Sequence, residues 1–572
     1  MGIISTVRTS CRDCYKCVRH CPVKAIRINL SHAEIVEERC IQDGRCVLIC
    51  PQGAKHVRDD LPVAKELLSQ GKRVVASLAP SFVAAFPDVS PGQMVSALKR
   101  LGFHAVRETA EGAEWVTREH LHLLHEGRTN LISSACPAIN NLIRRYFPEL
   151  LENLAPCVSP MVAHARLLHE EDPESKVVFI GPCIAKKGER EEPEVAEEVA
   201  VALTFVELKN WLREEGIEPA SLEEAEFDPS RCGWARSFPV EGGLLQSASL
   251  TCDLLSREVI VITGIERAKQ FLQELKEKKV DFRLVEMMAC EGGCIDGPVL
   301  RSSLSFYERR NRVLTYTEEY EKRSMCEGAS CYDPPSLRRT FSPQPVENPP
   351  VPEEELRKIL ALTGKFTPQD ELNCGACGYD TCREKAQAVY YGMAEAEMCI
   401  PFMRAKAESF SSFLIAVTPN GIVLVDEELR IVDMNPALRR MLELTGKLVV
   451  GKRVDEFFDS SPFVEVLRTK KAVTREFHYP QHHDLFVQVS VFYLEKPRLL
   501  MGVFIDLTRE KEQEETMQKM REKTLEKAQQ VINNQMRVAQ EIASLLGETT
   551  AETKVLLGKL MRILRGEEVS DE

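Results

Sequence analysis

The sequence predicts a multidomain α/β protein in which smaller units flank one larger domain. Between residues 61 and 330, short apolar runs alternate with amphipathic stretches of helical period, a pattern typical of mostly parallel sheets covered by helices. Cysteines gather in dense groups before and after this region. The chain of 572 residues has room for such an arrangement, because single domains usually hold about 50–250 residues.

Composition narrows the class of protein. The formal net charge of −13 argues against a nucleic-acid-binding surface, which requires clustered Lys and Arg. Several of the 20 cysteines are grouped in Cys-x2-Cys runs, and no apolar leader opens the chain, so we expect metal binding in a reducing cytoplasm. No apolar run approaches the length of about 20 residues that spans a bilayer. We therefore expect a soluble cytoplasmic protein.

Residues 1–60 carry two runs with the spacing of iron-sulfur ligands. They are Cys11-x2-Cys14-x2-Cys17-x3-Cys21 and Cys40-x2-Asp43-x2-Cys46-x3-Cys50, each followed by proline. This spacing resembles that of bacterial two-cluster ferredoxins, in which each fourth cysteine binds the other cluster. The resemblance implies a ferredoxin-like 2[4Fe-4S] module with one cluster on Cys11, Cys14, Cys17 and Cys50, and a second on Cys21, Cys40, Cys46 and Asp43.

Asp43 is a departure from that pattern, since a cysteine is expected there. A carboxylate is a harder ligand than a thiolate. Two outcomes are open: a [4Fe-4S] cluster with Asp43 bound, or a [3Fe-4S] cluster that lacks the fourth iron. Zinc is the alternative metal for these cysteines, but structural zinc sites are usually closed by four ligands.

Within residues 61–330, four strands are expected at residues 73–80, 130–134, 176–181 and 279–286. Cysteine loops follow three of them, in Ser133–Pro137, Gly181–Glu189 and Met287–Pro298. Ligands of α/β domains bind beyond the carboxyl ends of the strands. Four thiols from these loops therefore predict one iron-sulfur site, with Cys136, Cys183, Cys290 and Cys294 as ligands.

Together with the ferredoxin-like module, these loops make residues 1 to about 325 resemble the [FeFe]-hydrogenase large-subunit family. Supporting matches are Ser77–Ser81, Cys157–Pro160 and Phe238–Leu244. In that family the H-cluster is a [4Fe-4S] cubane joined through a cysteine sulfur to a di-iron centre with CO, CN⁻ and a bridging dithiolate amine. The resemblance implies that Cys136, Cys183 and Cys290 bind the cubane and Cys294 bridges to the di-iron unit. Lys186 would donate a hydrogen bond to a cyanide, and Met288 would pack beside the bridging CO.

Several positions depart from the family pattern. Ala135 occupies the place of a cysteine that relays protons in active members, and Ala155 occupies that of a relay serine. Gly181 replaces a methionine, and Gly297-Pro298 shortens a glycine run. The acidic end of the relay is not placed, although Glu119, His120 and His122 lie in the right region. These changes predict slow turnover, as in the sensory branch of the family, whose members often carry PAS domains.

Residues 331–354 are rich in proline and predict an extended, semi-rigid linker, with Cys326 and Cys331 as structural or free thiols near its start. Residues 355–405 then hold Cys374-x2-Cys377-x4-Cys382-x16-Cys399. This set resembles a small four-cysteine [4Fe-4S] domain of electron-transfer and corrinoid proteins. Zinc remains the alternative, because four cysteines alone do not specify the metal.

Residues 406–508 resemble a PAS domain of α+β type. Two short strands lie in Gly421–Asn435, a helix follows over residues 436–444, and paired strands end at Asp506-Leu-Thr508. His478, His482 and His483 could be haem ligands, but a polar loop that connects two strands favours surface histidines.

Residues 509–572 predict a helical hairpin or coiled coil. Apolar residues step by three and four along one face, at Leu525, Ala528, Ile532, Met536, Ala539, Ile542 and Leu546. Gly547 interrupts the stripe, a capping box begins at Thr549, and a second helix is expected over residues 555–564. We expect this element to form a homodimer. The region contains neither a histidine nor a nucleotide-binding glycine motif, so a histidine-kinase output is not expected from it.

The sequence thus favours a regulatory [FeFe] hydrogenase that reacts slowly and reversibly with H2 and passes its redox state through iron-sulfur clusters to the PAS and helical region. Expected partners are H2 and protons, a redox protein, a downstream kinase, phosphatase or regulator, and the hydrogenase maturation enzymes. One alternative is a catalytic oxidoreductase module whose PAS and helical regions only assemble a complex. A second is a hydrogenase-like iron-sulfur electron-transfer or scaffold protein without the di-iron unit.

Overall fold

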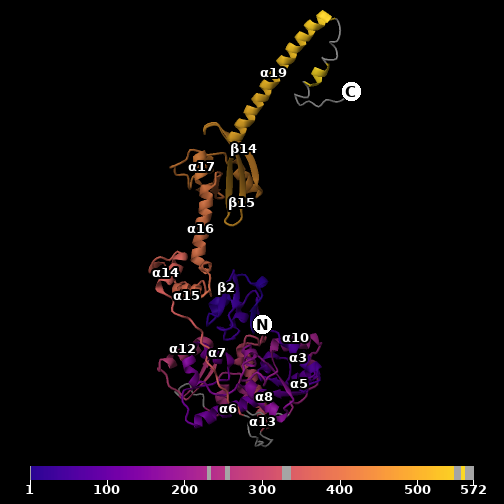
Figure 1. Ribbon diagram of the computed structural model, residues 1–572, viewed down its shortest axis with the longest axis vertical. Coiled ribbons are helices and arrows are strands. Elements are labelled where there is room, and N and C mark those ends of the chain that lie inside the picture. The colour runs from indigo at the N-terminus through magenta and orange to yellow at the C-terminus, as the bar shows by residue number, and fades with distance from the viewer. Residues whose placement is uncertain (1, 229–233, 251–257, 325–335, 547–554, 561–572) are drawn as a thin grey trace. The chain divides into compact units, whose positions relative to one another are not determined.

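The computed structural model describes residues 2–228, 234–250, 258–324, 336–546 and 555–560. It divides into two compact units, Met1–Met403 and Arg404–Glu572 (Figure 1).

The first 60 residues form a small module with a repeated pattern. Strand β1 (Ile4–Thr6) pairs antiparallel with β4 (Lys55–Val57), and β2 (Ile26–Asn29) pairs with β3 (His32–Ile35). The short helices α1 (Lys16–His20) and α2 (Arg45–Ile49) end where the two cysteine runs end. Each run therefore wraps one helix, as the ferredoxin-like expectation requires.

The larger domain contains two parallel sheets, which confirms its predicted class. One has the order β6-β5-β8-β9 and the other β10-β11-β7. A strand lies in or beside each of the four expected segments, but β11 begins only at Leu284, so residues 279–283 are not strand; the structure also adds β6, β9 and β10. The strand bounds are β5 (Val74–Leu78), β6 (Ala105–Glu108), β7 (Leu131–Ile132), β8 (Lys176–Gly181), β9 (Val201–Thr204), β10 (Val259–Thr263) and β11 (Leu284–Met288).

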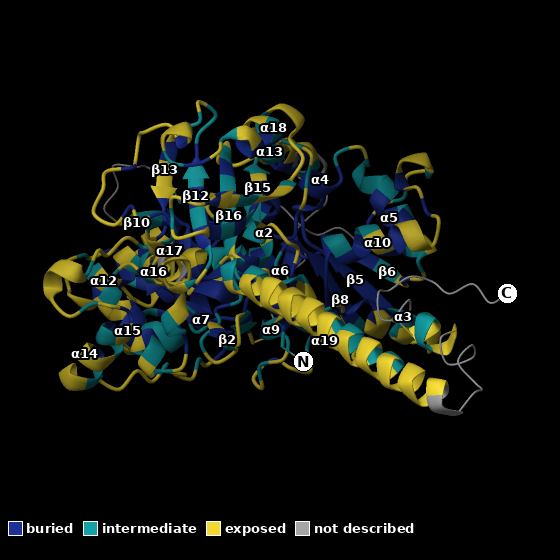
Figure 2. Cartoon of the chain, turned by 90° about the horizontal axis from the view of Figure 1, so that it is seen from above, coloured by how far each residue is buried: buried dark blue, intermediate teal, exposed yellow. Residues whose placement is uncertain are grey.

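Helices pack around these sheets, with their exposed faces outward and the strands buried (Figure 2). Strands such as β5 are buried at every position, which explains why they read as continuous apolar runs. The helices are α3 (Leu61–Ser69), α4 (Phe82–Ala85), α5 (Pro91–Arg100), α6 (Ala110–His125), α7 (Pro137–Tyr146), α8 (Pro160–Glu171), α9 (Ala185–Glu189), α10 (Phe205–Glu214), α11 (Gly243–Ser247), α12 (Ile265–Lys276) and α13 (Phe306–Ser324).

A buried ion triad joins the end of the first module to the α/β domain. The fully buried Lys187 ammonium lies 2.9 Å from an oxygen of Asp60 and 2.8 Å from one of Glu207. Burial alone would raise the pKa of Asp60, but hydrogen bonds from Arg58 and the charge of Lys187 outweigh it and lower the pKa below its usual value. The stabilisation is therefore present above the unfolded-state pKa and is lost as pH falls through the lower folded-state pKa.

Lys187→Met is expected to lower the free energy of unfolding by about 3–5 kcal/mol, because it leaves the buried Glu207 without its cation and Asp60 with Arg58 alone. Urea unfolding followed by tryptophan fluorescence measures this, since Trp115, Trp211 and Trp234 all lie in the α/β domain. Lys65→Met removes a surface pair with Glu214 and serves as the control, with an expected change below about 1 kcal/mol. Equal losses in both variants would contradict a structural role for the triad.

Residues 336–349 lie outside the helices and named strands, and the first of them pack on the α/β domain. Leu337 is buried, and its carbonyl accepts a 2.9 Å hydrogen bond from Val158 N. Arg339 N donates to Pro156 O at 3.1 Å. The segment is thus held against the loop before α8. Cys326 and Cys331 lie outside the described residues.

The second cysteine-rich region is a compact helical fold. Helices α14 (Glu353–Leu362) and α15 (Cys382–Tyr390) pack together, and α16 (Ile400–Val417) begins directly after Cys399. A capping box between Thr381 and Glu384 starts α15, which fixes Cys382 at its first turn.

The second unit contains a five-stranded antiparallel sheet of order β13-β12-β16-β15-β14, as expected for a PAS domain. Asn435 begins α17 by accepting from Leu438 N, and the same side-chain oxygen accepts from Ile422 N at 2.8 Å. His478 and His483 are exposed and His482 is partly exposed, which favours surface histidines. The elements are β12 (Gly421–Val425), β13 (Ile431–Met434), α17 (Pro436–Met441), α18 (Ser461–Thr469), β14 (Val473–Tyr479), β15 (Leu485–Leu494) and β16 (Leu499–Asp506).

One long helix, α19 (Thr508–Leu546), follows the sheet and carries the predicted apolar stripe. Ile542 in that stripe is 51% exposed, so the stripe has apolar surface free for a partner helix. The predicted turn at Gly547 and Thr549 lies outside the described residues, as does the end of the expected second helix; residues 555–560 are helical. Among the described helices, none combines the length and apolar character required to cross a bilayer.

Candidate metal centre

Four thiols from three strand ends surround one cavity in the α/β domain. Cys136 follows β7, Cys183 follows β8, and Cys290 and Cys294 follow β11, and all four line the same cavity of about 30 Å³. Gly293 allows the third loop its turn, because its φ is +77° and an added Cβ would lie 2.6 Å from Pro239 O. The structure therefore brings the predicted ligands together.

Burial disfavours the thiolate form of three of these cysteines, Cys183, Cys290 and Cys294. Burial raises the pKa of Cys183 to about 11, with a further contribution from Cys136. Burial also raises the pKa values of Cys290 and Cys294 well above the usual range, and neighbouring thiols add to it. Metal ions bind thiolates in exchange for protons, so four converging, partly buried thiols fit a thiolate-ligated cluster better than they fit any apolar packing role.

A second cavity of about 100 Å³ adjoins the first and shares Cys136, Cys183, Cys294 and Met288 with it. A water needs roughly 10–15 Å³ measured in this way, so the space accepts a group much larger than one water. Lys186 and Ala135 also line it. The predicted catalytic trio of Lys186, Met288 and Cys294 thus meets at one cavity.

Lys186 is held in place by a buried network that the sequence did not reveal. Its ammonium donates to Glu189 Oε2 at 2.9 Å, and Ser159 Oγ donates to the same oxygen at 2.9 Å. Arg339 donates to Glu189 Oε1 at 2.9 Å and also pairs with Glu192. An ammonium has three donors, so Lys186 keeps donors for a ligand in the cavity. Ser159 and Arg339 are distant from Lys186 in the sequence, and Glu189 lies in a charged stretch typical of a protein surface. The network could therefore not be predicted from the sequence.

Glu286 is a further cavity residue that sequence reasoning missed. It lies in the middle of β11, is 3% exposed, and lines the larger cavity. Burial raises its pKa to about 8, so the carboxyl group is largely protonated at neutral pH. Leu245 N donates to its Oε2 at 3.3 Å. The available signal was a lone acidic residue inside an otherwise apolar buried strand.

Ala135 lies at the cavity wall, where a proton-relaying thiol was expected and a methyl group stands instead. Ala155 is fully buried. His120 is buried, with Nδ1 bonded to Val116 O and its pKa lowered by burial, whereas His122 is exposed and Glu119 is partly exposed. The side chains of Glu119, His120 and His122 are not among those that line the larger cavity.

Most of the predicted ferredoxin-type ligands lie near one another in two groups. Cys40 and Cys46 interact electrostatically with Asp43 and with Cys21. Burial raises the pKa of Cys21 to about 12. Burial likewise raises the pKa of Asp43 to about 6. Cys17 interacts electrostatically with Cys11 and Cys14, which are predicted ligands of the other ferredoxin-type cluster. The structure brings no comparable evidence for Cys50 beyond its place at the end of α2.

Asp43 occupies a position between two sites, because it also lines the smaller cavity together with Cys136, Cys183 and Cys290. An ion pair of 2.9 Å between Arg45 and Glu291 holds the same loops together. The second ferredoxin-type site therefore adjoins the four-thiol site of the α/β domain.

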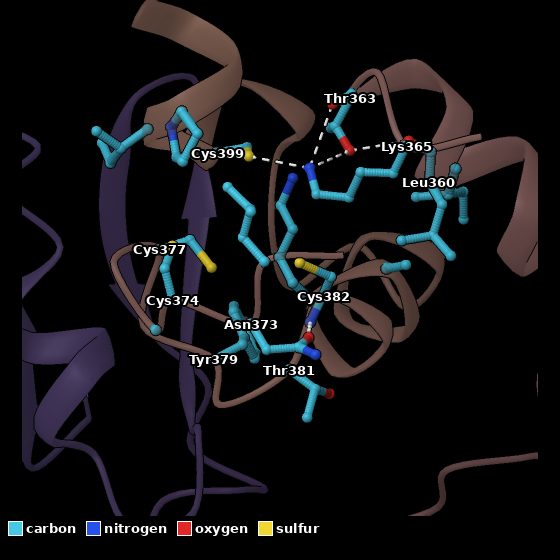
Figure 3. Close-up of a pocket in the computed structure, with 17 residues that line it drawn as sticks. Leu360, Thr363, Lys365, Asn373, Cys374, Cys377, Tyr379, Thr381, Cys382 and Cys399 are labelled. Atoms are coloured by element: carbon cyan, nitrogen blue, oxygen red, sulfur yellow. Dashed lines mark hydrogen bonds between the residues drawn. The ribbon is translucent and has the colours of Figure 1, made fainter. Parts of the chain in front are cut away.

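Cys374, Cys377, Cys382 and Cys399 line a separate pocket (Figure 3). Asn373 orients the start of α15 by accepting from Cys382 N at 2.8 Å. Burial raises the pKa of Cys377. This pocket gathers the whole predicted ligand set of the second cysteine-rich region.

Comparison with known families agrees with this division. The model for the iron only hydrogenase large subunit, C-terminal domain, matches residues 72–298, and a 4Fe-4S dicluster domain model matches residues 3–51. Residues 72–298 are therefore similar to the iron-only hydrogenase large-subunit family. An Fe-S cluster model matches residues 370–401 and a PAS model matches residues 419–509.

Curated relatives of the hydrogenase part are distant. The chain is 27% identical over 351 residues to the NADP-reducing hydrogenase subunit HndD of Solidesulfovibrio fructosivorans, covering 50% of this chain and 60% of that one. It is 27% identical to the periplasmic [Fe] hydrogenase large subunit of Nitratidesulfovibrio vulgaris, covering 52% and 87%. It is 24% identical to the cytosolic iron-sulfur assembly component 3 of Mus musculus, covering 45% and 68%.

Solved [FeFe]-hydrogenase structures also match, including one from Chlamydomonas reinhardtii with 21% identity and a TM-score of 0.43, covering 50% of this chain and 100% of that one.

Proposed function

We propose that the chain is a regulatory [FeFe] hydrogenase that reacts slowly and reversibly with H2 and passes its redox state to its PAS and helical region. The observation that carries this proposal is the second cavity beside the four-thiol site, lined by Lys186, Met288 and Cys294. A scaffold that held only a cubane would need the smaller cavity alone. Ala135 at the wall of the larger cavity supports slow turnover.

The residues have distinct roles in this proposal. Cys136, Cys183 and Cys290 would hold the cubane part of the H-cluster, and Cys294, which lines both cavities, would serve as a ligand where the two cavities adjoin. When bound, the H-cluster supplies the metal centre at which H2 is split or formed. Lys186 donates a hydrogen bond into the cavity while Glu189 holds its ammonium, and Met288 excludes water from the wall that it lines.

Proton movement is the step that this chain performs poorly. A methyl group at Ala135 neither accepts nor donates a proton, so a proton must reach the cavity by another route. Slow chemistry suits a regulator, because its output is the redox state and not the amount of product. Electrons would pass through the ferredoxin-type clusters and the four-cysteine cluster, and a kinase, phosphatase or other regulator would receive the signal.

A second candidate function is an iron-sulfur scaffold or electron-transfer protein without the di-iron unit. The similarity to the cytosolic iron-sulfur assembly component 3 favours it, and so does the fact that Lys186 already has a carboxylate partner. The presence of Met288 and of a larger adjoining cavity weighs against it.

Hydrogen oxidation by the full chain, coexpressed with maturation enzymes and assayed with an artificial acceptor, tests the proposal. We expect measurable turnover far below that of a metabolic hydrogenase, together with reduction of the accessory clusters under H2. Turnover equal to that of a metabolic hydrogenase would contradict the regulatory role. Complete absence of turnover and of cluster reduction would favour the scaffold.

A further inference from the structure

Two lysine ammonium groups face the four-thiol pocket of residues 355–403. Lys365 Nζ donates to Cys399 Sγ at 3.3 Å and is held by the carbonyl and hydroxyl oxygens of Thr363, both at 3.2 Å (Figure 3). Lys385 is 5% exposed, lines the same pocket, and donates to Ala396 O at 2.9 Å. The pocket therefore combines two cations with four sulfur ligands.

Lys365, which is partly buried, and Lys385, which is buried, lack the carboxylate partner that Lys186 and Lys187 have. Lys187 pairs with two carboxylates and Lys186 with Glu189. Within the described ranges, no carboxylate forms an ion pair with Lys365 or Lys385. A buried ammonium without an anion costs several kcal/mol. An anionic group in the pocket would remove that cost, and a thiolate-ligated iron-sulfur cluster is such a group.

The loop that carries Cys377 is docked directly on the ferredoxin-like module. Arg19 Nη1 donates to Ala376 O at 2.9 Å, and Lys24 Nζ donates to Gly378 O at 2.6 Å. Gly378 has a φ of +98°, and an added Cβ would lie 3.0 Å from Arg19 N, so the backbones approach too closely for a side chain.

Tyr379 completes this contact. Its side chain is 4% exposed and packs in the same apolar cluster as Val18 and Cys21. Helix α1 lies between Cys14 and Cys21, so the docked loop abuts the segment that carries ligands of both ferredoxin-type sites. The contact gives electrons a short path between the module and the four-thiol pocket.

We propose that residues 355–403 hold an electron-accepting iron-sulfur centre and that Lys365 and Lys385 raise its reduction potential above those of the ferredoxin-type centres. One electron leaves a ferredoxin-type centre, which is oxidised, and reduces the four-cysteine centre, with no bond made or broken. The inference rests on the proposed function only for the source of electrons in the cell.

The physical reason is charge. Reduction adds one negative charge to a cluster that is already anionic, and cations or hydrogen bonds at its sulfurs stabilise the reduced form. The ferredoxin-type site with Asp43 differs in charge, because a buried carboxyl group stands among its ligands where the four-cysteine pocket has lysines. The two lysines thus direct electrons away from the module and towards α16, which begins directly after Cys399.

A redox titration of the full cluster-loaded chain with dithionite, followed by low-temperature EPR, tests this inference. Cys382→Ala identifies the signal of the four-cysteine centre. We expect that signal to be reduced at a more positive potential than the ferredoxin-type signals. Lys365→Met and Lys385→Met should each shift it to a more negative potential, whereas Lys365→Arg should keep it near the wild-type value.

Lys358→Met is the matched control, since Lys358 pairs with Glu354 and Glu355 on α14 and does not line the pocket. It should leave the potential unchanged. If Lys385→Met fails to assemble the centre, the comparison of Lys365→Met with Lys365→Arg tests the inference. An unshifted potential in Lys365→Met would overturn the inference, as would reduction of this centre after the ferredoxin-type centres, or zinc in place of iron. Because dithionite supplies the electrons, failure of H2 chemistry would leave these results unaffected.

Discussion

Replacing Cys294 by alanine is expected to lower hydrogen oxidation at least about 100-fold and to reduce the iron content of the chain. Cys294 lines both cavities of the hydrogenase domain, so its loss removes a ligand of one site and the link to the other. Groups that merely support metal ligands already contribute about 10–100-fold. Activity with an artificial acceptor and iron determination on the same preparation measure the effect.

Cys157→Ala is the matched control for that variant. Cys157 is as fully buried as any residue of the domain but lines neither cavity. Its replacement should leave the iron content unchanged and affect only stability. If Cys294→Ala retained full iron and activity while Cys157→Ala lost both, the assignment of the site would be wrong.

Ala135→Cys is expected to raise the rate of hydrogen oxidation by about 100-fold, the lower end of what a positioned proton-transfer group contributes. Ala135 lines the larger cavity beside Cys136, so a thiol there would reach the space that the methyl group now borders. The measurement is the turnover rate with an artificial acceptor at saturating H2.

Ala135→Val separates proton transfer from size, because valine enlarges the side chain without adding a titratable group. We expect no gain in that variant. An equal gain in both variants would mean that side-chain size, and not proton transfer, limits turnover. No gain in Ala135→Cys would show that the missing thiol is not the bottleneck, and Glu286, protonated at neutral pH in the same cavity, would be the next residue to test.

Features encoded by local patterns were predictable from the sequence. The strands expected at residues 176–181 and 279–286 appear as β8 and, from Leu284, as β11, because buried parallel strands read as apolar runs. The cysteine loops follow such strands, so their meeting at one cavity could be predicted from sheet geometry. The PAS sheet and the long helix α19 were predictable because apolar residues recur with the period of a strand or of a helix.

Contacts between distant segments were not predictable. Arg339 lies in a proline-rich segment, yet it reaches Glu189 and so supports Lys186. Likewise, nothing in the spacing of the last four cysteines predicts that Tyr379 and Gly378 dock on α1. Such pairings depend on tertiary packing, which residue period and composition do not encode.

The most direct test of the central claim is infrared spectroscopy of the full chain after coexpression with hydrogenase maturation enzymes. The larger cavity lined by Lys186, Met288 and Cys294 predicts stretching bands of bound CO and CN⁻, which should disappear in Cys294→Ala. A wild-type spectrum without these bands, from protein whose cubane is fully assembled, would contradict the assignment of a di-iron site and leave the scaffold as the function.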